Sequence, residues 1–98
     1  MLWVAYCIDN ENSKAAREEH LAAHRNYLDS NADKIFFSGP IEADDASLIY
    51  GSIFLLSVAS RAAAEAFVEN EPFYKNGVFA SVRVARTRVG RYFPENLN

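Results

Sequence analysis

The sequence predicts a two-layered α+β domain of the ferredoxin-like type, with the element order β-α-β-β-α-β. Three observations lead to this prediction: four apolar segments of strand length, two longer segments of helix-forming residues between them, and polar or Gly/Pro-containing turns at the junctions. In this plan a four-stranded antiparallel sheet carries both helices on one face. The 98 residues contain no internal repeat or linker, so we expect a single domain over residues 1–98.

The first half of the chain predicts a strand, a helix and a second strand. Residues 2–8 form an unbroken apolar run with aromatic and branched side chains, which is typical of a buried strand. Polar residues 9–13 offer several helix caps, and residues 13–29 combine good helix formers with an apolar stripe. Residues 35–38 predict a short second strand, which we expect to end at Gly39-Pro40.

The second half begins with an acidic segment, residues 42–47, that lacks periodicity and predicts a loop. Residues 49–58 predict the third strand, with Gly51 as a bulge or a point of close backbone approach. Ser60 is suited to cap a second helix over residues 61–70.

The second helix has a clear stop signal, and a strand follows it. Pro72 disfavours helical geometry at Glu71, so we expect the helix to end there. Residues 78–85 alternate in the manner of a fourth strand. The tail after Val89 is polar.

The composition limits which partners and which cellular compartment we expect for this protein. A net charge of −3 disfavours broad contact with a nucleic-acid backbone, which requires a basic surface. The apolar runs are far shorter than the ~20 residues that span a bilayer, and no basic segment precedes the first of them as in a signal peptide. Cys7 is the only cysteine, so no intrachain disulfide forms. We therefore expect a cytoplasmic protein without nucleic-acid or membrane partners.

The predicted sheet has more apolar surface than two helices can cover. Residues 2–8 and 49–58 are apolar on both faces of their strands, whereas a one-sided antiparallel sheet alternates apolar with polar side chains. A face of four strands presents about 300–400 Å², which is near the limit that a monomer leaves exposed. We expect a two-fold homodimer through this face. The alternative is that the long loop or the C-terminal tail folds across it.

His20 is the leading candidate for chemistry, because an imidazole exchanges protons near neutral pH. Glu71 is its candidate partner, since a carboxylate near an imidazole fixes the tautomer and favours the protonated form. The plainer alternatives are a histidine at an ordinary helix edge and a solvated acid at a helix end.

Metal, redox and nucleophilic sites have little support in the sequence. His20 and His24 lie one helical turn apart, but a metal site needs further ligands, so we expect no metal and treat His24 as a helix-face residue. Ser38, Ser52 and Ser57 have no nucleophile context, and no cofactor motif is present, so we expect no cofactor. The cluster of arginines near the C-terminus is either a solvated edge or a contact with an anion or another subunit: Arg83, Arg86, Arg88 and Arg91.

Several short motifs, taken together, resemble the YciI-like (YCII-related) family in order and spacing. They are Arg17-Glu18-Glu19-His20-Leu21, Ser38-Gly39-Pro40, the helix start at Ser60, and Glu71-Pro72-Phe73. The resemblance implies a dimeric α+β barrel with an active-site pair, a histidine on the first helix and an aspartate before the proline. His20 matches the first position and His24 matches none. Glu71 stands where the family usually has Asp, which keeps the charge but extends the side chain by one methylene.

These expectations define two candidate functions. The first is a cofactor-independent enzyme of the lyase or isomerase type, acting by proton transfer on a small cyclic or aromatic acid. His20 would be its acid/base and Glu71 would orient it, and the substrate would contact Arg17, Ser38-Gly39-Pro40 and Phe73. The alternative is a non-catalytic dimeric module that binds a small ligand or a partner through the same pocket.

Overall fold

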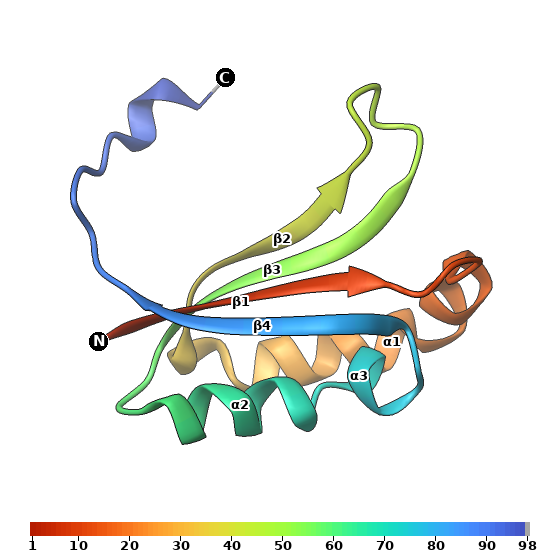
Figure 1. Ribbon diagram of the computed structural model, residues 1–98, viewed down its shortest axis with the longest axis horizontal. Coiled ribbons are helices and arrows are strands. Elements are labelled where there is room, and N and C mark those ends of the chain that lie inside the picture. The colour runs from red at the N-terminus through yellow and green to blue at the C-terminus, as the bar shows by residue number, and fades with distance from the viewer. Residues whose placement is uncertain (98) are drawn as a thin grey trace.

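The computed structural model describes residues 1–97 and has the predicted two-layered plan (Figure 1). The elements are β1 (Leu2–Asp9), α1 (Lys14–Ser30), β2 (Ile35–Glu42), β3 (Ile49–Ser57), α2 (Arg61–Glu69), α3 (Pro72–Lys75) and β4 (Phe79–Thr87), with 3-10 turns at Ala32–Lys34 and Pro94–Asn96. The four strands form one antiparallel sheet in the order β2-β3-β1-β4. The helices α1, α2 and α3 cover one face of it, which confirms the α+β prediction.

The core lies between the sheet and α2. Alternate residues of β1 and β3 face the helices, so Trp3 pairs with Leu56 and Ala5 with Phe54 across the strands. These side chains pack with Phe67 of α2, and all are buried. Because side chains alternate along a strand, Val4, Tyr6 and Ile8 point to the opposite side of the sheet.

Strand β2 is longer than predicted. Gly39 and Pro40 do not end it, and the strand continues to Glu42 with Pro40 paired to Ser52 of β3. Proline is tolerated here because β2 is an edge strand, where a backbone position without an N–H need not break the ladder. Ser38 and Pro40 consequently share the face of Phe54 and Ser52, which is the helix side of the sheet.

The second helix begins and ends as predicted, but Glu71 has an unexpected place. The Ser60 hydroxyl accepts a hydrogen bond from the Ala63 N–H at 3.1 Å, which confirms it as the helix cap. Pro72 ends α2 and also begins α3, since proline is favoured at a first helical position. Glu71 is the N-cap of α3, and its Oε2 accepts the Phe73 N–H at 3.2 Å. It is fully buried rather than solvated at a helix end.

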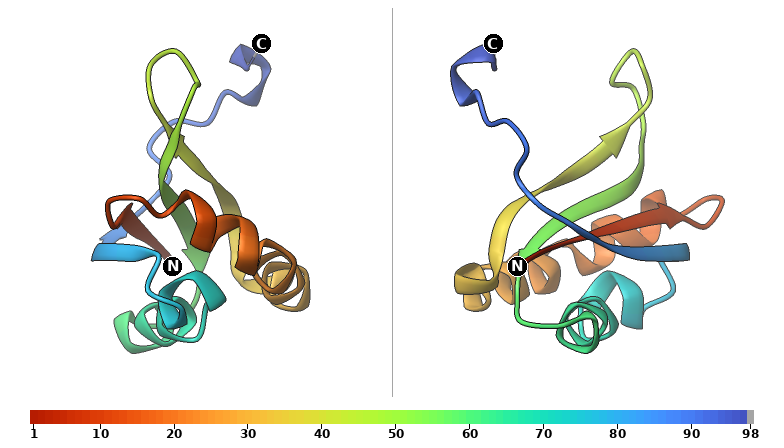
Figure 2. Two further views of the ribbon diagram at one scale, coloured as in Figure 1. Left: turned by 90° about the vertical axis from the view of Figure 1, so that its right-hand side faces the viewer. Right: turned by 60° about the vertical axis from the view of Figure 1, so that its left-hand side comes forward.

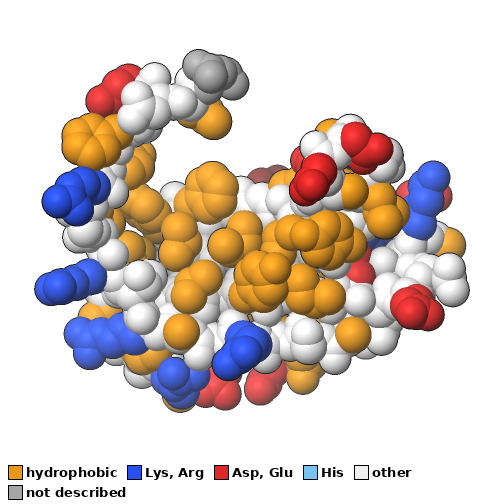
Figure 3. Space-filling view, turned by 45° about the horizontal axis from the view of Figure 1, so that its top comes forward, with side chains coloured by type: hydrophobic (Ala, Val, Ile, Leu, Met, Phe, Trp, Pro, Cys, Tyr) orange, Lys and Arg blue, Asp and Glu red, His pale blue; other side chains and the backbone are white. Residues whose placement is uncertain are grey.

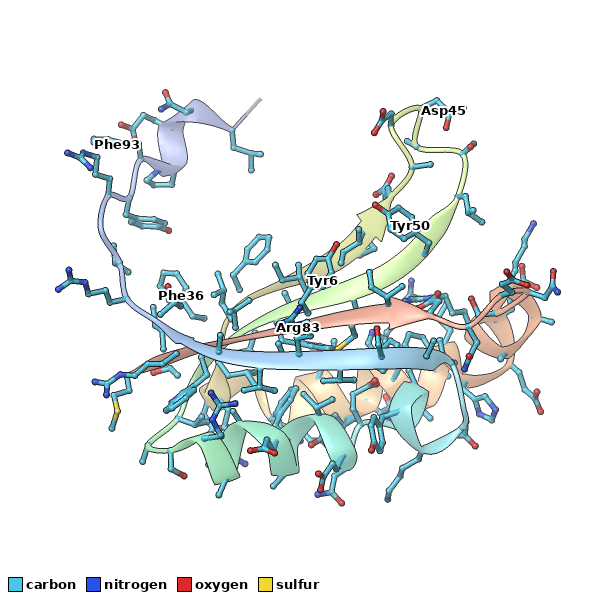
Figure 4. All side chains as sticks on the ribbon, viewed as in Figure 1. Tyr6, Phe36, Asp45, Tyr50, Arg83 and Phe93 are labelled. Carbon is cyan, nitrogen blue, oxygen red and sulfur yellow. The ribbon has the colours of Figure 1, made fainter. Side chains whose placement is uncertain are left out.

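The side of the sheet away from the helices, called the open face below, carries no helix. The β2–β3 hairpin and the C-terminal arm, residues 88–97, both stand on this side, at opposite ends of the strands (Figures 1 and 2). Neither covers the face: Tyr6 remains 41% exposed and Phe37 53%. Hydrophobic side chains gather between hairpin and arm (Figure 3), and Tyr6 points into this space (Figure 4).

Candidate active site

A histidine and a glutamate meet where α1 packs against α3. His24 Nδ1 lies 2.5 Å from Oε1 of Glu71, whose side chain has no exposed surface. The prediction that His20 contacts Glu71 is wrong. His20 lies one turn earlier, and its Nε2 is 3.7 Å from the exposed carboxylate of Glu19.

The geometry of α1 explains why His24 and not His20 faces inward. Residues Arg17, Leu21, His24 and Leu28 follow the spacing of one helix face, and all four line a cavity beneath the sheet. His20 is one residue before Leu21, so it is rotated by about 100° around the helix axis toward the edge.

Phe73 orients both His24 and Arg17. The His24 and Phe73 rings are stacked with centroids 4.0 Å apart and an interplanar angle of 9°. The Arg17 guanidinium carbon lies 4.8 Å from the centre of the same ring, and Phe79 meets it edge-on at 6.2 Å. Since Phe73 is buried, it gives both side chains a fixed surface to pack on.

Arg17 is held by a network that the sequence analysis did not identify. Its Nε and Nη2 donate to the two carboxylate oxygens of Asp9 at 2.6 and 2.9 Å, and Nη2 also donates to the Ser52 hydroxyl at 3.0 Å. The Ser13 hydroxyl donates to Asp9 at 2.8 Å. This bidentate contact fixes the plane of the guanidinium. Within residues 1–97, these hydrogen bonds leave Nη1 available to a ligand.

Two features of the sequence could have pointed to Asp9 and Ser52. Asp9 continues the inward-facing series of Cys7 on β1, so its carboxylate belongs to the helix side of the sheet. Ser52 lies on the inward, apolar side of β3, where a buried hydroxyl requires a hydrogen-bond partner.

A cavity of about 320 Å³ opens beside His24 and Arg17. The residues predicted to contact a substrate all line it: Arg17, Ser38, Gly39, Pro40 and Phe73. Glu71 lies behind His24 and does not line the cavity, and neither does His20. A second hollow of about 360 Å³ shares Arg17, Ile49 and Phe73 with the first and continues to Leu48 in the β2–β3 loop.

The negative charges behind the site act on two neighbouring groups. Burial, followed by the nearby carboxylates of Glu71 and Asp9, raises the pKa of the Cys7 thiol to about 12, and Arg17 partly opposes this shift. Burial and then Glu71 also raise the pKa of Tyr27, whose hydroxyl donates to the Phe67 carbonyl at 2.7 Å. Cys7 is therefore a neutral thiol at physiological pH and is not suited to be a nucleophile.

The remaining site and membrane features can be stated for residues 1–97 only. No group of three or more His, Cys, Asp and Glu side chains in this range is placed to hold a metal ion. None of the helices in it has the length and apolar character of a membrane-spanning segment.

The arrangement is suited to proton exchange with a small molecule. An ionised carboxylate can only accept hydrogen bonds, so Nδ1 of His24 is the donor to Glu71, and in the neutral imidazole this leaves the lone pair on Nε2. Arg17 lies beside it on the same cavity and offers N–H donors to an anion. A base and an anion-binding group therefore line the same small cavity.

Comparison with known proteins identifies the family of this chain and several solved structures that are similar to it. A model of the YCII-related domain matches residues 1–88. A solved structure of 5-chloro-2-hydroxyhydroquinone dehydrochlorinase (TftG) from Burkholderia phenoliruptrix AC1100, in complex with 2,5-dihydroxybenzoquinone, is 34% identical. It superposes with a TM-score of 0.84, over 92% of this chain and 96% of that one.

More distant solved structures were also found. At3g17210 from Arabidopsis thaliana has 13% identity and a TM-score of 0.48, over 94% of this chain and 97% of that one. Rv0793 from Mycobacterium tuberculosis has 15% identity and a TM-score of 0.49, over 90% and 94%. A search of curated proteins finds no match.

Proposed function

Because this chain belongs to the YCII-related family, we propose that it is a cofactor-independent enzyme that transfers a proton on a small ring compound. The observation that carries the proposal is the His24–Glu71 pair, 2.5 Å long, with Glu71 fully buried and His24 on a cavity shared with Arg17. The proton-transfer chemistry proposed from the sequence is therefore kept, but His24 takes the role that was first given to His20.

Each residue has a distinct role in the proposed reaction. His24 Nε2 takes a proton from a ring hydroxyl or a ring carbon, and Glu71 orients the imidazole and stabilises the imidazolium that forms. Arg17 holds the oxyanion that develops on the substrate. The electron pair released by the proton then either expels an anionic group from a neighbouring carbon or is reprotonated by His24 at another carbon. The first outcome is a lyase reaction and the second is an isomerase reaction.

The cavity and the similar structure favour small oxygenated rings as substrates. A volume of about 320 Å³ lies at the lower end of ligand pockets and suits a single substituted ring. TftG, at 34% identity over nearly the whole chain, is a dehydrochlorinase of a hydroxylated hydroquinone and was solved with a dihydroxybenzoquinone. We infer that the substrate here is a hydroxylated phenol or quinone, or a small ring acid, whose anionic oxygen meets Arg17.

We also propose that the protein is a homodimer through the open face. The support is the apolar character of that face, where Tyr6 and Phe37 are exposed and no helix covers the strands. Large exposed apolar surfaces of this kind mark interaction sites.

The proposed activity is tested by comparing His24→Gln with His20→Gln, two equivalent changes one turn apart on α1. Wild-type protein is assayed against chlorinated hydroxyhydroquinones, hydroxylated quinones and small aromatic acids, following chloride release and ring absorbance. We expect His24→Gln to lower kcat/KM by about 10²–10⁴-fold, the usual contribution of a general base, and His20→Gln to change it by less than about twofold.

Two results would contradict this assignment. If His20→Gln lost as much activity as His24→Gln, the pair with Glu71 would not be the catalytic unit. If wild-type protein were stabilised by these rings, by about 2.7 kcal/mol at 100 times the Kd, but converted none of them, the non-catalytic alternative would hold.

A further inference from the structure

The second hollow continues the candidate site along α1, away from His24. It has a volume of about 360 Å³, and it shares Leu21 with the first cavity as well as Arg17, Ile49 and Phe73. Because four residues line both spaces, the two hollows adjoin. A molecule bound beside His24 can therefore extend into the second hollow.

The fold brings the two walls of this hollow together at one end of the sheet. Strands β1 and β2 both pair antiparallel with β3, so they run in the same direction and end at the same side (Figure 1). Helix α1 begins shortly after β1, and the β2–β3 loop begins directly after β2. Consequently Lys14 and Glu18 of α1 line the same hollow as Ala46 and Leu48 of the loop.

The loop wall is held in shape by its own hydrogen bonds. The Ala43 N–H donates to the Leu48 carbonyl and the Ala46 N–H donates to the Ala43 carbonyl, both at 2.8 Å. The Asp45 carboxylate accepts the backbone N–H and the hydroxyl of Ser47 at 3.0 and 2.6 Å. The wall is therefore formed before a ligand binds, which lowers the entropy cost of binding.

The charges and apolar side chains of the hollow favour an uncharged ligand group. Leu48 is 52% exposed and Ile49 41%, so the rest of residues 1–97 leaves much of their surface uncovered. Exposed apolar side chains beside a ligand cavity are a surface that an apolar ligand group can cover. Lys14 and Glu18 are exposed, lie one helical turn apart and have opposite charges, so a charged group attracted by one is repelled by the other.

We propose that the second hollow is a subsite for an apolar substituent, and that the protein prefers oxygenated rings with an alkyl chain over bare rings. The inference rests on the proposed function, which places the ring beside His24 and Arg17. The chain then runs past Ile49 toward Leu48. Leu48 is the specificity-determining residue, because it lines the second hollow and not the first.

The subsite is tested with catechol and with alkylcatechols that carry a methyl, propyl or pentyl chain on either free ring position. The Kd of each for wild-type protein is measured by titration calorimetry. A fully buried methylene strengthens binding about fourfold, so four methylenes that are partly covered should give roughly a tenfold gain or more from methyl to pentyl in one of the two series.

Leu48→Ala separates the two hollows, because it removes an apolar wall of the second and leaves the first unchanged. It should weaken the binding of the favoured pentylcatechol by about threefold or more and keep the Kd of catechol within about twofold of wild type. Leu97→Ala is the matched control, since it makes the same truncation at a leucine that is 88% exposed and lines neither hollow. It should leave both Kd values unchanged.

The outcomes distinguish the subsite from the proposed reaction. If the wild-type Kd did not fall with chain length, or if Leu48→Ala bound pentylcatechol as wild type does, the subsite would be wrong, while the reaction would still be decided by His24→Gln. Tighter binding of a catechol with a carboxypentyl chain than of pentylcatechol would overturn the apolar assignment. If the alkylcatechols bound as expected but His24→Gln kept full activity, the subsite would stand and the proposed reaction would be wrong.

Discussion

At the scale of single residues, Glu71 organises the candidate site because its buried carboxylate is bonded from two elements. It binds His24 of α1 through one oxygen and the Phe73 N–H of α3 through the other. A buried charge is tolerated only with such partners, since an unpaired one costs several kcal/mol. Its field also reaches Cys7 and Tyr27, whose pKa values it helps to raise. One carboxylate therefore fixes the histidine and adds to the effect of burial on the neighbouring thiol.

The neutral thiol gives a testable dependence of stability on pH. The thiol of Cys7 ionises near its ordinary value of 9.0 in the unfolded chain but only at about 12 in the folded protein. Above pH 9 the unfolded state therefore binds fewer protons than the folded one, and the stability contributed below pH 9 is lost as pH rises toward 12. The loss relative to Cys7→Ala should approach ~1.4 kcal/mol per pH unit.

Urea unfolding of wild type and Cys7→Ala at neutral pH and at about pH 10.5 measures this difference. The cavity left by the substitution lowers stability equally at both values, so only the change with pH is informative. If the free energy of unfolding changed equally with pH in the two proteins, the native thiol would titrate normally.

The identity of the histidine that contacts Glu71 shows what the sequence can and cannot indicate at the scale of single residues. His20 and His24 lie on one helix, and the family-like motif around His20 favoured the wrong one. The helical spacing indicates that His24 faces inward, because it lies between Leu21 and Leu28 on the same face of the helix. Which acid it meets depends on how α3 packs against α1, and no local pattern determines that contact.

At the scale of elements, Gly51 sets how closely β1 and β3 approach. A Cβ at this position would lie 2.5 Å from the Cys7 carbonyl oxygen and 3.0 Å from Ile41 Cδ1. Because that oxygen belongs to the central strand, the clash cannot be relieved by a side-chain rotation. This confirms the prediction that Gly51 marks a close backbone approach.

Gly51→Ala should lower the free energy of unfolding by about 1–3 kcal/mol, the usual cost of overpacking. Gly39→Ala is the matched control, because its Cβ would meet the Phe37 ring at ordinary contact distances, 3.7 Å to Cζ and 4.0 Å to Cε1. It should leave stability within about 1 kcal/mol of wild type. Equal losses in the two variants, measured by urea unfolding, would mean that the contact at Gly51 is not the cause.

The sequence predicts the identity of the elements and the ends of α2, but not the end of β2. The strands and the two long helices follow from hydrophobic period and from the Ser60 and Pro72 signals. Gly39-Pro40 predicts a strand end because both residues are common in turns, yet β2 lies at the sheet edge, where proline is tolerated. Whether a strand lies at the edge or in the centre of the sheet depends on the strand order, which the local residues do not encode.

At the scale of the whole molecule, the open face is a large apolar surface that the other elements within residues 1–97 leave exposed. Its exposure follows directly from β1 and β3, which are apolar on both sides while the helices cover only one. The pattern predicted the excess of apolar surface, but the covering element could have been the tail. The arm instead extends beyond the sheet and touches it through Tyr92 and Phe36.

Tyr6→Glu tests whether a second copy covers this face. Tyr6 lies on the open face in the central strand and is 41% exposed, so a carboxylate there is solvated in a monomer but buried between two apolar sheets in a dimer. Burial without a partner costs several kcal/mol, so the dimer Kd should rise by about a hundredfold or more. The subunit should keep its fold, which circular dichroism and thermal unfolding can establish.

Tyr74→Glu is the matched control, because Tyr74 is 43% exposed but lies on α3, on the helix side. It should leave the Kd unchanged. If light scattering gave the same dissociation for both variants, the contact would not be on the open face, since the two substitutions differ chiefly in the side of the sheet that receives the charge.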